Sequence, residues 1–147
     1  MVSLNFYLKI KCISSSKRKD SAKKAEDVLL LMSELGEADE NIRPDKLTFA
    51  AVMNCWAHTK SEDAGDKARE ILQLMEKRSA TGDTYLTPTI ITYGTVLNAY
   101  AKCGHKDAPK NVLEILSFLE KEYEKGNLHL KPNGAIYNVG ELETIPK

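Results

Sequence analysis

Apolar side chains recur along this chain with the three- and four-residue spacing of amphipathic helices. One stripe reads Phe49, Val52, Met53 and Trp56, and it recurs as Tyr93, Val96, Leu97 and Tyr100. A second stripe reads Ala25, Val28, Leu29 and Met32, then Ala68, Ile71, Leu72 and Met75, then Val112, Ile115, Leu116 and Leu119. The two stripes alternate along the chain, so the pattern predicts an all-α fold of helix pairs with these residues in its core.

Prolines and aromatic residues set the length of the repeating unit. Pro44, Pro88 and Pro132 lie 44 residues apart, and Phe49, Tyr93 and Tyr137 each follow five residues later. Asn54 and Asn98 keep the same spacing. We predict a repeat array over residues 4–138, with units at about 3–45, 46–89 and 90–133, a fourth beginning at 134, and a divergent tail at 139–147.

The residues between the stripes fit helix boundaries. Asp45 and Thr89 follow the prolines and can cap the first helix of a unit. Gly104 is expected to end such a helix, and Pro109 suits the first turn of the next one. A two-helix unit cannot bury its apolar face alone, so stacking of neighbouring units is expected to close the core. Polar end helices are missing, so we expect a segment of a longer protein or a truncated gene product.

Composition favours a soluble helical chain. Of the 147 residues, 42% are hydrophobic and 29% are charged. The longest apolar run, Val28 to Met32, is too short to span a bilayer, which predicts no membrane partner. Basic and acidic residues number 21 each, so any nucleic-acid binding must depend on local placement of charge. The charged side chains of residues 1–24 are all basic except Asp20, a bias that a solvated end of the chain also explains.

The reactive side chains do not form a recognisable catalytic or metal-binding pattern. Three cysteines, Cys12, Cys55 and Cys103, without a secretory signal favour reduced thiols in an intracellular protein. Cys55 and His58 could form half a zinc site, but a structural site needs four ligands, and Cys55 reads better as a packing residue. We therefore expect no metal, no cofactor, no small-molecule substrate and no enzymatic activity.

Several segments resemble the pentatricopeptide-repeat family. Residues 91–104, ITYGTVLNAYAKCG, and residues 47–57, LTFAAVMNCWA, resemble the first helix of that repeat. Residues 68–75, AREILQLM, look like its second helix, while IRPD at 42–45 and LKPN at 130–133 look like its closing turn. The unit is longer than the family's usual one, and the extra residues, around Ser61–Gly65 and Ala80–Leu86, are expected in loops.

The resemblance implies a right-handed α-solenoid of stacked helix-turn-helix repeats that binds single-stranded RNA, with one base per repeat. By repeat position, the side chains that read base edges are Tyr7 with Asp45, Ala50 with Thr89, Gly94 with Asn133, and Asn138. The base-stacking position falls on Leu4, Leu47, Ile91 and Ala135, and the cationic position on Ser15, His58 and Lys102.

Two functional hypotheses follow. The first is a single-stranded RNA-binding module of a factor in RNA processing, stability or translation, which the resemblance places in a mitochondrion or plastid. The second is a protein-interaction scaffold of the tetratricopeptide type, favoured by zero net charge and by Ala50 and Gly94, which lack hydrogen-bonding side chains. An acidic surface around Ala50, Gly94, His58 and Lys102 would count against RNA.

Overall fold

The computed structural model describes residues 18–144, which form helices and contain no strand. The α-helices are α2 (Lys19–Leu35), α3 (Lys46–Thr59), α4 (Ala64–Ala80), α5 (Ile90–Cys103), α6 (Ala108–Glu124) and α7 (Gly134–Thr144). Short 3₁₀ turns precede α3, α5 and α7, namely η1 (Glu40–Ile42), η2 (Thr84–Leu86) and η3 (Leu128–Leu130). The all-helical prediction is confirmed for these residues. The first expected helix, around Phe6 and Cys12, lies outside them.

The helices recur with the spacing of the sequence pattern. α3 begins at Lys46, α5 at Ile90 and α7 at Gly134, so successive starts are 44 residues apart. α4 and α6 begin at Ala64 and Ala108, with the same separation. The 44-residue period of the apolar pattern is therefore also the period of the secondary structure from α3 onward.

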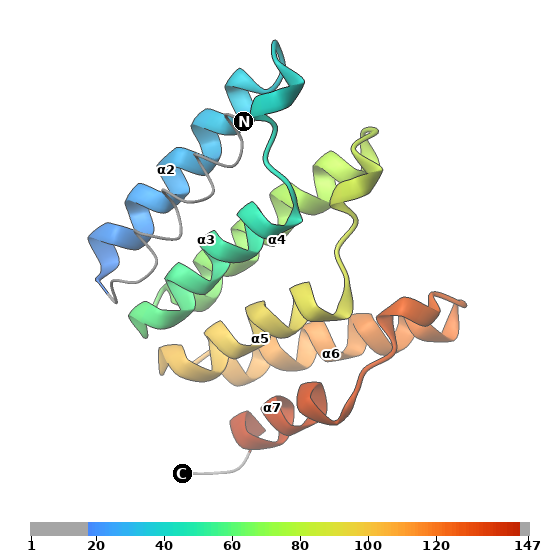
Figure 1. Ribbon diagram of the computed structural model, residues 1–147. Coiled ribbons are helices and arrows are strands. Elements are labelled where there is room, and N and C mark those ends of the chain that lie inside the picture. Colours follow the sequence, from blue (N-terminus) through green and yellow to red (C-terminus); the bar gives the residue numbers. More distant parts are fainter. Residues whose placement is uncertain (1–17, 145–147) are drawn as a thin grey trace.

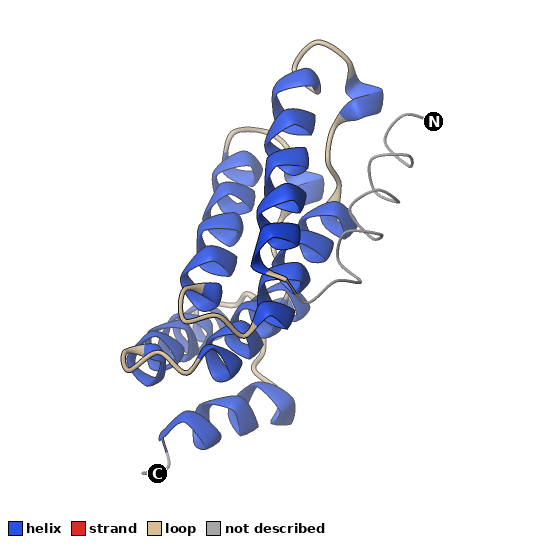
Figure 2. Cartoon of the chain, turned by 90° about the vertical axis from the view of Figure 1, so that its left-hand side faces the viewer, coloured by secondary structure: helices blue, strands red, loops and turns tan. Residues whose placement is uncertain are grey.

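The helices pack in chain order (Figure 1). α3 contacts α2, α4 and α5, and α5 contacts α3, α4, α6 and α7. In Figure 1, α3, α5 and α7 lie one below another, with α4 and α6 behind α3 and α5. Figure 2 shows the same helices from the side, joined by short loops. α3, α5 and α7 thus form one continuous layer of neighbouring helices.

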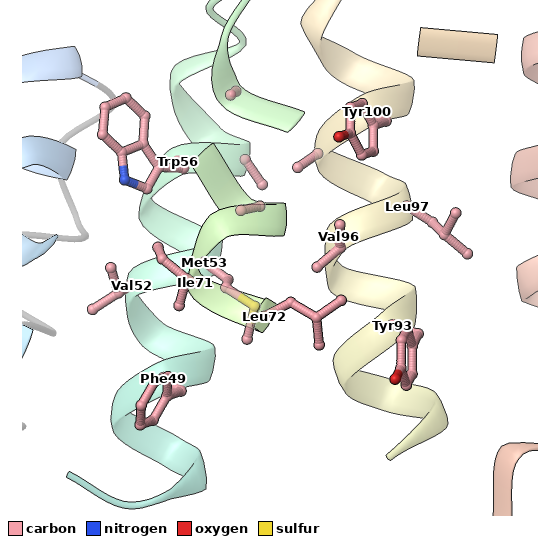
Figure 3. Close-up of a cluster of buried hydrophobic side chains, with 14 of the residues drawn as sticks. Phe49, Val52, Met53, Trp56, Ile71, Leu72, Tyr93, Val96, Leu97 and Tyr100 are labelled. Atoms are coloured by element: carbon pink, nitrogen blue, oxygen red, sulfur yellow. The ribbon is translucent and has the colours of Figure 1, made fainter. Parts of the chain in front are cut away.

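The apolar stripes meet between these helices (Figure 3). Side chains of α3, α4 and α5 interleave there, including Phe49, Met53, Leu72 and Tyr100. Trp56 is 1% exposed, which confirms the prediction that it belongs to the core rather than to a surface site. The predicted core residues are buried, apart from the half-buried Val28. Cys55 is also buried, as expected for a packing residue.

The helix ends follow the expected local rules, with two differences. Gly104 ends α5 in the left-handed region at φ 70°, and Pro109 lies in the first turn of α6. Ala64 and Gly65, expected in a loop, instead begin α4, where Gly65 packs against the Tyr100 ring. α7 runs on to Thr144, so the helix continues through most of the segment whose sequence leaves the repeat pattern.

Polar contacts at recurring positions join successive helices. The hydroxyl of Tyr93 donates to Glu76 Oε1 at 2.7 Å, and that of Tyr137 donates to Glu120 Oε1 at 3.2 Å. The two tyrosines are 44 residues apart, and so are the two glutamates, so the bond recurs between α4 and α5 and between α6 and α7. The corresponding residues of the preceding unit are Phe49 and Met32, which are both apolar and buried. The hydrogen-bonded tyrosine–glutamate pair of the later units is therefore replaced by an apolar phenylalanine–methionine pair in the first unit.

Candidate nucleic-acid interface

One exposed face runs along α3, α5 and α7, and we call it the first-helix face. Its residues are Leu47, Ala50, Asn54 and His58 on α3, Ile91, Gly94, Asn98 and Lys102 on α5, and Ala135 and Asn138 on α7. Steps of three, four and four residues bring side chains to the same side of a helix. The opposite sides of α3 and α5 carry the buried stripes, so this face points away from the core.

Large aliphatic side chains project from the first turns of α3 and α5. Leu47 is 62% exposed and Ile91 is 78% exposed. These residues are 44 positions apart and occupy the predicted base-stacking position, which Ala135, also exposed, continues on α7. Single exposed apolar side chains are common, and Leu30, Leu31 and Leu113 are exposed on other helices. The recurrence at equivalent points of two neighbouring helices is what makes Leu47 and Ile91 a candidate ligand surface.

Polar and basic side chains follow on the same face. Asn54 is exposed and Asn98 is half-buried, and neither amide forms a hydrogen bond with another described residue. His58 and Lys102 are exposed in the last turns of α3 and α5 and form no ion pair with residues 18–144. The recurrence of asparagine is visible in the sequence, but only the structure places both amides between the aliphatic and the basic side chains.

Acidic residues are unevenly distributed among the helices. Neither α3 nor α5 contains an aspartate or a glutamate, whereas α7, the third helix of the first-helix face, carries Glu141 and Glu143, and α2, α4 and α6 carry several each. The exposed Lys46, His58 and Lys102 make the surface of α3 and α5 neutral to positive, with Asp45 at its edge. The acidic surface that would count against an anionic ligand is therefore not found on these two helices.

The positions expected to read base edges carry small residues, and one of them lies close to the next helix. Ala50 and Gly94 are both half-buried. A Cβ added to Gly94 would lie 3.2 Å from Ile136 Cδ1 of α7, which is tighter than an ordinary van der Waals contact. A larger residue at Gly94 would therefore require the end of the Ile136 side chain to move by a few tenths of an ångström.

The residues after the prolines act as helix caps. Asp45 Oδ1 accepts hydrogen bonds from the Thr48 N–H and the Thr48 hydroxyl, both at 2.9 Å. Asn133 Oδ1 accepts from the Ile136 N–H at 3.1 Å, and the Thr89 N–H donates to Thr92 Oγ1 at 3.1 Å. The predicted capping role of Asp45 is confirmed, and Thr89 is the residue at the N-cap of α5.

The remaining predicted residues are divided between this face and the undescribed part of the chain. Asn138 is exposed on α7, on the same face as Asn54 and Asn98. Tyr7, Leu4 and Ser15 lie outside the described residues. Clefts of about 440 and 390 Å³ lie away from the first-helix face, beside Tyr93 and Phe118 and beside Arg43 and Arg78 respectively.

Other kinds of site receive no support from the described residues. Between residues 18 and 144, no three His, Cys, Asp or Glu side chains are grouped so that they could hold a metal ion. In the same range, no helix has the length and hydropathy needed to cross a bilayer. Comparison with known proteins found no family model, no characterised protein and no solved structure that matches the chain.

Proposed function

We propose that this chain is a single-stranded RNA-binding module, and that the RNA lies along the first-helix face. The observation that carries the proposal is the exposure of Leu47 and Ile91 at equivalent positions on two helices that contain no acidic residue. An exposed apolar side chain offers a platform for the face of a base, and a neighbouring cation can contact a phosphate.

The proposal includes the architecture and the family that the sequence resembles. Helix pairs with a 44-residue period, in which α3, α5 and α7 form one layer, suit a segment of a right-handed α-solenoid of long pentatricopeptide-like repeats. In such an array each further pair would extend the first-helix face by one helix. We place the module in an RNA processing, stability or translation factor of a mitochondrion or plastid, by resemblance to that family.

The side chains on the face favour binding over catalysis and weak discrimination between bases. Ala50 and Gly94 present no hydrogen-bonding side chain to a base edge, whereas Leu47 and Ile91 can pack against any base. Contacts to base faces and phosphates hold a strand without specifying its sequence. We therefore propose a sequence-tolerant binding module without enzymatic activity of its own.

A protein-interaction scaffold is the second candidate. Exposed aliphatic side chains on neighbouring helices also suit an apolar peptide, and Ala50 and Gly94 would leave room for one. The charge of the face separates the two candidates, because a peptide held by apolar contacts needs no phosphate and its binding should respond little to salt.

The proposal is tested by fluorescence anisotropy with labelled random-sequence single-stranded RNA at about 50 and 200 mM salt. Affinity should fall as salt rises, and the slope of log K against log salt should become shallower by about 0.7 in Lys102→Gln if Lys102 neutralises one phosphate. Leu47→Ser with Ile91→Ser should weaken binding by about 1 kcal/mol for each lost platform.

Leu113→Ser is the matched control, because Leu113 is a 48%-exposed leucine on α6, away from the first-helix face. It should leave RNA affinity unchanged. Failure of the chain to bind RNA at low salt would refute the proposal. If the chain instead binds a peptide with an affinity that does not depend on salt, and the Leu47 and Ile91 variants lose that affinity, the scaffold function is the correct one.

A further inference from the structure

The first-helix face presents its side chains in a fixed order on both α3 and α5. From the N-terminal end the order is aliphatic, amide, basic: Leu47, Asn54, His58 on α3 and Ile91, Asn98, Lys102 on α5. A helix rises 1.5 Å per residue, so the aliphatic and amide residues are about 10 Å apart along the axis, and the amide and basic residues about 6 Å apart.

The asparagines of the described chain fall into two groups. Four of them form hydrogen bonds that hold turns or helices together: Asn41, Asn111, Asn127 and Asn133. Three have no hydrogen bond to a described residue, and all three lie on the first-helix face: Asn54, Asn98 and Asn138. Within residues 18–144, the amides on this face therefore have no part in the polar contacts that hold the fold together, and no described residue occupies their donors and acceptors.

The order of side chains matches the order of groups in a nucleotide, which is base, sugar, phosphate. With a base against the aliphatic side chain and a phosphate near the basic one, the ribose lies beside the amide. An amide offers both a donor and an acceptor, and the ribose 2′-hydroxyl is likewise both. We infer that Asn54 and Asn98 hydrogen-bond the ribose 2′-hydroxyl and so make the module select RNA over DNA.

This inference rests on the proposed function and makes it more specific. Residues that contact base faces and phosphates do not distinguish RNA from DNA, because both polymers share those groups. The 2′-hydroxyl is the group by which a protein can tell the two apart. Selection for the sugar also agrees with the lack of base-edge contacts at Ala50 and Gly94, since the sugar carries no sequence information.

The test compares single-stranded RNA with single-stranded DNA of the same base sequence, carrying uracil in place of thymine so that only the 2′-hydroxyl differs. Wild-type protein should bind the RNA more tightly. A neutral hydrogen bond contributes about fivefold in affinity, so Asn54→Ala and Asn98→Ala should each lower RNA affinity about fivefold and leave DNA affinity unchanged. The double variant should bind both strands with nearly equal affinity.

Gln73→Ala is the matched control, because it removes an exposed amide from α4 and should not change the RNA-to-DNA ratio. Circular dichroism should confirm that all variants keep their helical content. Equal wild-type affinity for RNA and DNA, or parallel loss of both in the asparagine variants, would overturn the inference while leaving nucleic-acid binding in place. Absence of binding to either strand would overturn the proposed function itself.

Discussion

At the scale of single residues, Gly65 at the start of α4 leaves the least space for a side chain among the described glycines. A Cβ added there would overlap the ring of Tyr100, which is 2% exposed and hydrogen-bonded to Asp66 Oδ1 at 2.8 Å. Gly65→Ala should therefore lower the free energy of unfolding by about 1–3 kcal/mol, the usual cost of overpacking. Urea denaturation followed by circular dichroism measures this change.

Gly134 provides the control for that substitution. It begins α7, and an added Cβ would meet no atom within 4 Å. Gly134→Ala should be neutral or stabilise by a few tenths of a kcal/mol, because alanine loses less backbone entropy than glycine in a helix. Equal denaturation midpoints for Gly65→Ala and the wild type would show that α4 does not pack against Tyr100 as described.

A second residue-scale prediction concerns Lys60, which follows α3 with φ 54°. A lysine in the left-handed region is strained, whereas Gly104, 44 residues later, adopts the same region at φ 70° without a Cβ. Lys60→Gly should raise the free energy of unfolding by about 1 kcal/mol. Gly104→Ala should lower it by a similar amount in the same urea titration, and a loss of stability in Lys60→Gly would contradict the argument.

At the scale of helices, the N-terminus of α3 depends on one carboxylate. Asp45 Oδ1 accepts from both the backbone and the hydroxyl of Thr48, so Asp45→Ala should cost about 1 kcal/mol of stability. Asp45→Asn keeps an acceptor oxygen and should retain most of that stability. A thermal melt of the two variants separates them, and equal losses would mean that the cap contributes through its charge rather than through the hydrogen bond.

Helices were more predictable from the sequence than the surface they present. Apolar spacing and proline positions predicted α3 to α6, because the spacing of apolar residues within a segment largely decides whether it forms a helix with one buried side. The start of α4 was misplaced, because the residues that exceed the family's usual unit were assigned to a loop at Ser61–Gly65, whereas Ala64 and Gly65 begin the helix. The contacts of Gly65 with Tyr100 and of Gly94 with Ile136 were not predictable either, because each joins residues that are more than 30 positions apart in the sequence.

At the scale of the whole molecule, tyrosine hydroxyls link successive helices through carboxylates. Burial, with the hydrogen bond to Glu76, raises the pKa of Tyr93 well above its ordinary value of 10.0. Burial and the hydrogen bond to Asp66 likewise raise the pKa of Tyr100 from 10.0. Both bonds join α4 to α5, the central pairing of the described chain. Ionisation of these phenols would place a negative charge against each carboxylate at the centre of the molecule.

The resulting prediction is a loss of stability at alkaline pH. Unfolded tyrosine releases its proton near pH 10, whereas folded Tyr93 and Tyr100 hold theirs to higher pH. Above that pH the unfolded state binds fewer protons, so the free energy of unfolding falls as pH rises. Urea midpoints measured from about pH 9 to 12 should therefore decline as pH rises. The decline should be shallower in the Tyr93→Phe, Tyr100→Phe double variant. At neutral pH that variant should be less stable than the wild type by about 1 kcal/mol per lost hydrogen bond. An unchanged alkaline slope in that variant would mean that these two phenols do not account for the loss of stability in this pH range.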